Sequence, residues 1–319
     1  MKPFHTFVTA CLLWGNTMMA SAQESRTAYN FLRLPQSAHA AALGGDNISL
    51  VDDDAMLAQH NPALLYNVSN KTLSLGYMNY MEGVQTAGAA FNMHWGERAS
   101  WGVNAQYLNY GTMTETTYDW RELGTFSAKE VAVAGLLAYE LGRGFVGGIT
   151  ARFVSSHIGR YNALAAAVDL GVNYYSEDKG LSLSAVVRSL GGQLKAFEDD
   201  FERMPTDVQV GVTYRLHSAP LRFSLTAVRL NDWEVHGLGN HLVVGADVLL
   251  GDVLYLSAGY NALRAKEMKI DLGDDGSSAH GAGLSFGAGL TLKRIKAQAS
   301  YAKYHVSSHA LLLNFCYTL

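Results

Sequence analysis

The stretch Asp207–Leu216, with the sequence DVQVGVTYRL, decides the fold. Valine, tyrosine and leucine occupy every second position of it, and Asp, Gln, Gly, Thr and Arg occupy the positions between. In a β-strand such alternation places one set of side chains on each face. Asn162–Tyr174 and Leu242–Val248 repeat the pattern, with Asp169 and Asp247 among the polar residues. Soluble strands are usually about five or six residues long, whereas a tilted strand needs roughly nine to eleven to cross a bilayer.

Segments of this kind follow one another from residue 72 to the end of the chain. Fourteen strands are expected: 72–81, 84–95, 100–110, 129–141, 145–157, 162–174, 181–189, 207–216, 221–231, 241–249, 254–261, 285–292, 295–304 and 309–317. Short connections follow even-numbered strands: 96–99, 142–144, 217–220, 251–253 and 293–294. Long connections follow odd-numbered strands: 111–128, 190–206, 232–240 and 262–284.

Outer-membrane barrels have this division, because their periplasmic turns are short and their extracellular loops are longer. The sequence therefore predicts an all-β fold over residues 71–319, a 14-stranded antiparallel transmembrane β-barrel in the outer-membrane lipid bilayer. It also predicts that both termini lie in the periplasm and that the long loops are extracellular.

The amino-acid composition agrees with an outer-membrane barrel and argues against a nucleic-acid-binding protein. Charged residues make up 16% of the chain, against roughly 25% in an average soluble domain. The 32 glycines, 17 tyrosines and 5 prolines suit long curved strands with aromatic girdles. The net charge of −4 argues against nucleic-acid binding, which needs a concentrated basic face.

The N-terminus has the features of a secretory signal peptide. Lys2 is a short positive region, Phe7–Trp14 is apolar, and Ala20–Ala22 offers a small-residue cleavage site. We therefore expect residues 1–22 to be removed. A lipoprotein box ending at Cys11 is the alternative, but the apolar run before that cysteine is short and continues after it.

Residues 23–70 have a different pattern from the strands. Ser37–Leu43 predicts a short helix that ends at Gly44-Gly45, and a second short segment stops at Asn61-Pro62. The acidic run Asp52–Asp54 suits helix capping, with a calcium site as the alternative. Because this segment is too apolar for a free tail, we expect a helical plug inside the barrel or against its periplasmic mouth.

The chain carries no assembled catalytic or metal-binding motif, so no catalytic residue, metal or cofactor is assigned. His305–His309, with two serines, is where a hydrolase site at the rim would lie, a solvated loop being the simpler account. Asp169, Arg215 and Asp247 fall on inner faces of their strands. There they would line a channel, pair with each other or hold a plug.

An ordered set of short motifs precedes the barrel. The set consists of Tyr29–Leu32 (YNFL), Ser37–Gly45 (SAHAAALGG), Asp52–Asp54 and Asn61–Leu65 (NPALL). Together with the expected fourteen strands, it resembles the PorV/PorQ family, outer-membrane barrels of the type IX secretion system that are related to the FadL fatty-acid transporters. The resemblance implies a non-enzymatic member of the cell-surface attachment complex, whose partners are a PorZ-like protein, a PorU-like sortase and a PorV-like shuttle barrel. That complex links cargo to surface lipopolysaccharide, which would be a further partner.

The long connections are the candidate contact regions. Tyr118 and Trp120 in the first, and Phe197 and Phe201 in the second, are predicted to bind a partner, because aromatic residues often anchor interfaces. The same residues would otherwise belong to the aromatic girdle at the bilayer rim. Two other functions stay open: a FadL-like transporter of hydrophobic small molecules and an outer-membrane lipid hydrolase.

Overall fold

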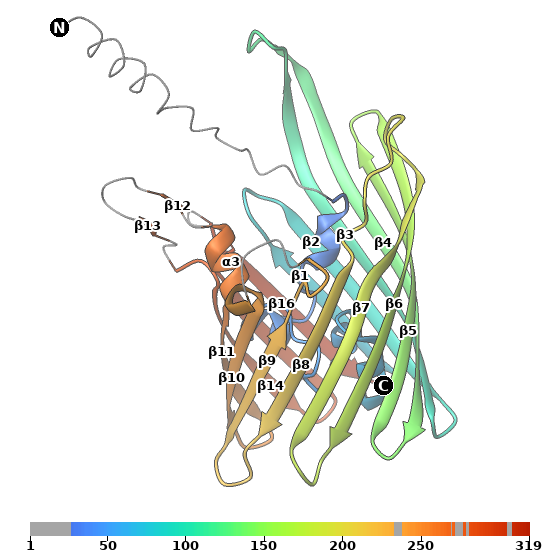
Figure 1. Ribbon diagram of the computed structural model, residues 1–319, viewed down its shortest axis with the longest axis vertical. Helices are drawn as coiled ribbons and strands as arrows, with labels where there is room; N and C mark the ends of the chain where they lie inside the picture. The colour runs from blue at the N-terminus through green and yellow to red at the C-terminus, as the bar shows by residue number, and fades with distance from the viewer. Residues whose placement is uncertain (1–26, 233–237, 269, 272–276, 279–280, 305–307) are drawn as a thin grey trace, which may run out of the picture.

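Fourteen strands close an antiparallel barrel in the described part of the chain (Figure 1). The computed structural model describes residues 27–232, 238–268, 270–271, 277–278, 281–304 and 308–319. The barrel strands are β1 Thr72–Asn79, β2 Gln85–Trp95, β3 Ala99–Thr116, β4 Glu122–Gly142, β5 Phe145–Ile158, β6 Tyr161–Ser176, β7 Leu181–Lys195, β8 Asp207–Arg215, β9 Leu221–Ala227, β10 Leu242–Leu250, β11 Leu254–Asn261, β14 Leu284–Leu292, β15 Ile295–Ala302 and β16 Ala310–Thr318. Strand β1 pairs with β16 from Thr72↔Thr318 to Asn79↔Leu311, which closes the wall. The predicted antiparallel order and number of barrel strands are confirmed.

The wall is apolar outside and polar inside. Leu73 and Leu75 of β1 and Leu313 of β16 are exposed, whereas Ser74 and Asn314 between them are buried. An apolar outer face is unfavourable in water and matches the lipid-facing surface of an outer-membrane barrel. None of the helices that the structure describes is long and apolar enough to cross a membrane.

The connection expected at 111–128 is mostly strand. Strands β3 and β4 continue to Thr116 and Glu122 and pair with each other beyond the barrel wall, so that only residues 117–121 join them. Figure 1 shows this hairpin rising above the other strands. After residue 110 both faces of β3 are largely polar, so no apolar alternation marked the extension in the sequence.

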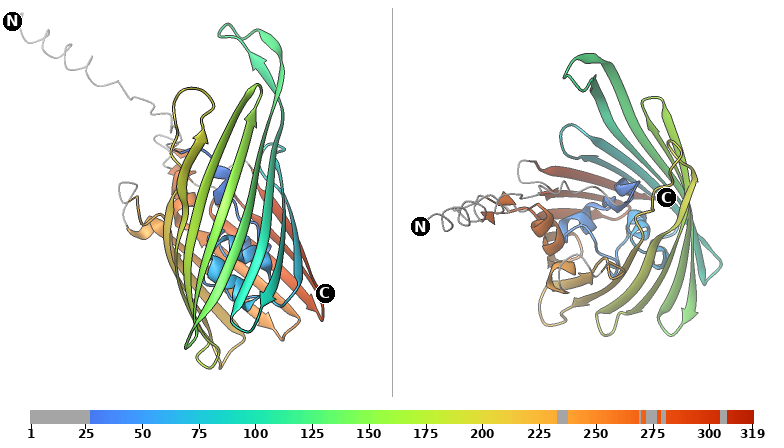
Figure 2. Two further views of the ribbon diagram at one scale, coloured as in Figure 1. Left: turned by 90° about the vertical axis from the view of Figure 1, so that its right-hand side faces the viewer. Right: turned by 45° about the horizontal axis from the view of Figure 1, so that its top comes forward.

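The segment from residue 27 to residue 70, which we call the plug, runs inside the barrel (Figure 2). It contains three 3-10 helices and one short α-helix: η1 Asn30–Arg33, α2 Ala38–Ala42, η2 Ala55–Gln59 and η3 Pro62–Asn67. The connection 262–284 contains α3 Ala262–Glu267 and the short pair β12 Ile270–Asp271 and β13 Ser277–Ser278.

The chain that the structure describes begins and ends at different mouths of the barrel, and the predicted mature N-terminus lies outside the described residues. The N–H of Leu319 donates to the carbonyl of Lys71, so the C-terminus lies at the mouth formed by the short connections. The N–H of Ala28 instead donates to the carbonyl of Arg203, in a long connection at the other mouth. The reason is that the plug runs along the lumen before β1 begins. Residues 1–22, the predicted signal peptide, lie outside the described residues.

Candidate functional site

Glycine pairs on the inner wall receive the plug. Gly148 of β5 and Gly171 of β6 lie opposite each other. A Cβ at Gly148 would approach the backbone of Pro62 and Ala63 to under 3.0 Å, and one at Gly171 would meet the side chain of Asn61. Real Cβ atoms essentially never make such contacts, so glycine is what lets the N-P-A turn lie flat against the strands.

Two further pairs hold other parts of the plug. Gly245 of β10 and Gly259 of β11 are cross-strand partners, and Leu43 and Gly44, at the end of α2, lie against them. Gly76 of β1 and Gly88 of β2 form a third cross-strand pair, and Gln36 of the plug lies against both. The three pairs lie on different sides of the barrel, so they fix the plug's position in the lumen.

Polar side chains cap the short helices of the plug. Ser37, Asp54 and Asn61 each accept a hydrogen bond from a backbone N–H in the first turn of α2, η2 and η3 respectively. The capping interpretation of the acidic run is therefore correct for Asp54. Asp53 instead accepts hydrogen bonds from the N–H and Oγ of Ser69, at 2.8 and 2.7 Å. Among the residues that the structure describes, no cluster of His, Cys, Asp or Glu could hold a metal ion.

A buried charge cluster joins the plug to the wall, and we call it the latch. It consists of His39 and Asp52 from the plug and Arg222, Asp247 and Lys296 from strands β9, β10 and β15. His39 Nδ1 lies 2.7 Å from Asp52 Oδ2, and His39 Nε2 lies 3.1 Å from Asp247 Oδ1. Arg222 Nε donates to Asp247 Oδ2 at 2.7 Å, and Lys296 Nζ pairs with Asp52.

The latch keeps Asp52 ionised. Burial raises the pKa of Asp52, but the charge of Lys296 and the hydrogen bond with His39 outweigh burial and hold that pKa well below its usual value. Removing one charged partner would leave the other buried without compensation, and this is costly. The latch therefore stabilises the plug only as a complete unit.

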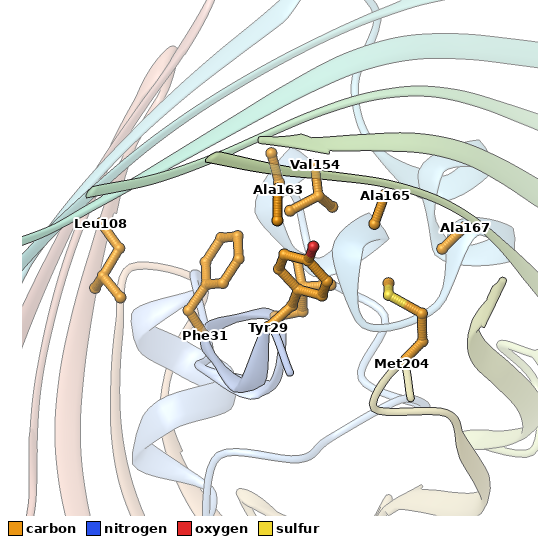
Figure 3. Close-up of a cluster of buried hydrophobic side chains, with 10 residues drawn as sticks. Tyr29, Phe31, Leu108, Val154, Ala163, Ala165, Ala167 and Met204 are labelled. Atoms are coloured by element: carbon orange, nitrogen blue, oxygen red, sulfur yellow. The ribbon is translucent and has the colours of Figure 1, made fainter. Parts of the chain in front are cut away.

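At the mouth with the long connections, apolar contacts hold the start of the plug. Figure 3 shows Tyr29 and Phe31 pointing toward Leu108 of β3 and Val154 of β5, with Met204 beside them. These residues form one buried cluster. The plug is thus anchored at two depths, by apolar packing near one mouth and by the latch farther along the barrel.

Two of the three inward charges predicted from the sequence form buried ion pairs. Asp169 pairs with Arg152 at 2.8 Å, and Asp247 belongs to the latch. Arg215 lines a cavity of about 430 Å³ at the mouth with the short connections. Asp169 therefore pairs with another wall residue and Asp247 ties down the plug, whereas Arg215 lines a cavity.

Cavities lie beside the plug at the other mouth as well. One of about 660 Å³ is lined by three arginines, of which Arg33 belongs to the plug and Arg229 to the segment after β9. A neighbouring cavity of about 160 Å³ shares both of these residues. Ionised side chains line each of these spaces, which therefore suit polar ligands better than hydrocarbons.

The four aromatic residues predicted to bind a partner lie on two connections in different environments. Tyr118 is 99% exposed and Trp120 is 87% exposed, at the tip of the β3–β4 hairpin. Phe201 is exposed, but Phe197 is half-buried and packs against the apolar cluster around Tyr29. Phe197 thus belongs to the apolar packing at this mouth, and its side chain is less available to a partner than that of Phe201. Residues 305–307, where the alternative hydrolase site falls, lie outside the described residues.

Sequence reasoning missed the latch partners His39, Arg222 and Lys296 and all the glycine pairs. A usable signal existed for the glycines, because Gly148 and Gly171 interrupt strand interiors where glycine is otherwise unfavourable. The latch left no comparable signal, since its members are far apart in the sequence.

Comparisons with known proteins agree with this fold. No protein-family model matches the sequence, and no curated protein sequence matches it. Among solved structures, the CymD monoaromatic hydrocarbon channel superposes with a TM-score of 0.61 at 14% identity, covering 92% of this chain and 99% of that one. A FadL homologue of Pseudomonas aeruginosa gives a TM-score of 0.56 at 10% identity, with 88% and 98% covered. The toluene transporter TodX of Pseudomonas putida gives 0.53 at 11% identity, with 89% and 97% covered. At these identities the likeness concerns the fold alone, so the chain has the fold of these FadL-like outer-membrane β-barrels.

Proposed function

We propose that this protein is an outer-membrane anchor of a type IX secretion attachment complex, and that its long connections hold a surface partner. The observation that carries the proposal is the contrast between a lumen filled by a latched plug and a hairpin whose aromatic tip is exposed. The motif set before β1, which resembles that of the PorV/PorQ family, supports the same function.

The lumen offers poor conditions for hydrophobic cargo. Its cavities are lined by ionised groups, including Arg33, Arg215 and Arg229, and the inner face of β8 carries Gln209 and Thr213 rather than apolar side chains. A hydrophobic compound would lose free energy on entering such spaces. The function is therefore assigned to the outer surface, with the plug as a structural part.

The hairpin supplies the contact surface. Tyr118 and Trp120 at its tip carry large apolar areas with polar ends, the type of side chain that dominates interface energies. By the resemblance, the partner is a PorZ-like protein, with a PorU-like sortase and a PorV-like barrel in the same assembly.

The test is affinity purification of the tagged barrel from detergent-solubilised outer membranes of its native host. One variant replaces residues 113–126 with Asn-Gly, which keeps the pairing of Thr112 with Ser127 and closes it with a two-residue turn. We expect sortase-like and PorZ-like proteins to co-purify with the unaltered barrel and to be lost with the shortened hairpin. Their absence from the unaltered sample would overturn the proposal.

Transport of hydrophobic compounds is the second candidate, and the comparisons favour it over secretion. The superposable structures are named as a monoaromatic hydrocarbon channel and a toluene transporter. Transport would require the plug to move or the latch to open. Uptake of radiolabelled toluene by cells that carry the barrel, measured against cells that carry an empty vector, tests this candidate, and equal uptake would exclude it.

A further inference from the structure

A depression lies on the outer, lipid-facing wall, over strands β14 and β15. It has a volume of about 360 Å³ and a mainly apolar lining. Ala288 and Ala299 are opposite each other at its centre. Because alanine is short, the outer surface is lower here than where leucine or phenylalanine faces outward.

Larger side chains surround the depression on three sides. The pair Phe286↔Tyr301 lies on the side toward the long connections. On the side toward the short connections, Leu290 is paired with Ala297, a third alanine that lines the depression. Leu256 of β11 is paired beside Ala288, and Leu313 of β16 is paired beside Ala299. The outline is open at Ala297, on the side toward the short connections, whereas the other directions across the wall end in an exposed large side chain.

Two cations lie in the short connection between the two strands that form the depression. Lys293 and Arg294 make up the connection between β14 and β15, and both are exposed. Lys71, next to the C-terminus, adds a third cation at this mouth. Asp252 and the carboxylate of Leu319 are the nearby anions, so the edge of the depression keeps a positive balance.

We propose that this depression binds one anionic phospholipid, with an acyl chain over Ala288 and Ala299 and the phosphate at Lys293 and Arg294. The lipid belongs to the leaflet that faces the short connections, which is the periplasmic leaflet by the orientation predicted for the barrel. Charge complementarity selects this occupant, because an apolar groove that ends at adjacent cations matches a lipid with an anionic headgroup. The proposal does not depend on the function proposed above.

Native mass spectrometry of the delipidated barrel in mild detergent tests the site, with dioleoyl phosphatidylglycerol and dioleoyl phosphatidylcholine as probes. We expect one phosphatidylglycerol to be retained in preference to phosphatidylcholine. The double variant A288L/A299L fills the depression and should lower that binding by on the order of tenfold. K293E/R294E should remove the preference for the anionic lipid, since cations near a membrane surface attract anionic headgroups and the substituted carboxylates repel them.

Two matched variants serve as controls. A105L enlarges an outward alanine of β3 that faces Ala89 in the same kind of cross-strand pair, and R143E reverses an exposed charge in another short connection. Neither should change lipid retention, and all variants should show the heat-modifiable band of a folded barrel on gels. Equal retention in A288L/A299L and A105L would overturn the proposal. So would a dimer that A288L/A299L alone dissociates, because the occupant would then be a second copy of the chain.

Discussion

The plug and the β3–β4 hairpin both depart from a plain barrel, and they differ in burial and in their contacts with the wall. All residues of α2 are buried, and His39 within it contacts two carboxylates. In the hairpin, residues 112–116 pair along the sheet only with residues of β4 up to Ser127, and Trp120 at the tip is 87% exposed. The plug is therefore positioned by the wall, whereas the hairpin is free to meet another molecule.

This difference shows that contacts with the plug restrict which residues the inner wall can carry. A buried polar group must be paired, so each plug contact restricts the wall residue that makes it. An exposed hairpin has no such restriction, and substitutions there leave stability nearly unchanged. Substitutions in the two regions should consequently separate stability from partner binding.

The largest effect is expected from Asp247→Ala. The substitution leaves the largely covered Arg222 without its carboxylate and deprives the buried His39 of one partner. Breaking a buried pair in this way costs about 3–5 kcal/mol, which urea unfolding of the barrel in liposomes will measure. The control is Asp252→Ala, at an exposed position in a nearby connection. If both variants unfold at the same urea concentration, the latch does not hold the plug.

A smaller effect is expected from Gly148→Ala. The added Cβ would overlap the backbone at Pro62 and Ala63, so the N-P-A turn must move away. Overpacking of this kind costs about 1–3 kcal/mol and should expose the plug to proteases. Gly135→Ala in β4 is the matched control, because nothing lies within 4 Å of the Cβ it would gain. Equal protease resistance in the two variants would show that the glycine pairs are not required.

The next effect depends on pH. In the folded protein the pKa of Asp52 is depressed, against burial, by Lys296 and His39. Its contribution to stability is therefore fully present above the pKa of the unfolded state, about 3.9. It is lost as pH falls from there through the folded pKa. Asp52→Asn should thus be less stable than the unaltered barrel at pH 7, by less than Asp247→Ala because Asp52 is more exposed.

Unfolding curves at pH 7, 5 and 3 measure this difference. The gap between the Asp52→Asn variant and the unaltered barrel should be the same at pH 7 and pH 5 and smaller at pH 3. A gap that widens toward acid pH would contradict a depressed pKa at this carboxylate.

Much of the fold was predictable because lipid-facing and lumen-facing residues alternate along every strand of a transmembrane barrel. Alternation along Asp207–Leu216 gave one strand, and its repetition gave the number and order of all fourteen. The extension of β3 to Thr116 was not predictable, since Thr112, Thr114 and Thr116 share one face, Glu115 lies on the other, and neither face has an apolar period.

The candidate site was less predictable because its parts meet only in three dimensions. Capping by Asp54 is local and could be inferred from its position before a short helix. The contact of His39 with Asp247 joins residues 208 positions apart, and the contact of Asn61 with the wall depends on glycines in two strands. The sequence around Phe197 predicted an exposed aromatic residue, but Phe197 packs against the buried apolar cluster that contains Tyr29.

The smallest effect on stability is expected from Tyr118→Ala combined with Trp120→Ala. Both side chains are almost fully exposed, so the unfolding free energy should change by no more than about 0.5 kcal/mol. The same change should remove most partner capture from solubilised membranes, because truncating aromatic anchors at an interface commonly costs about 2 kcal/mol or more each. Trp95→Ala is the control, since Trp95 is 71% exposed beside a short connection at the opposite mouth and should change neither quantity. If the double variant captured the partner as well as Trp95→Ala does, the hairpin tip would not be the contact, and the exposed Phe201 on the other connection would be the next position to test.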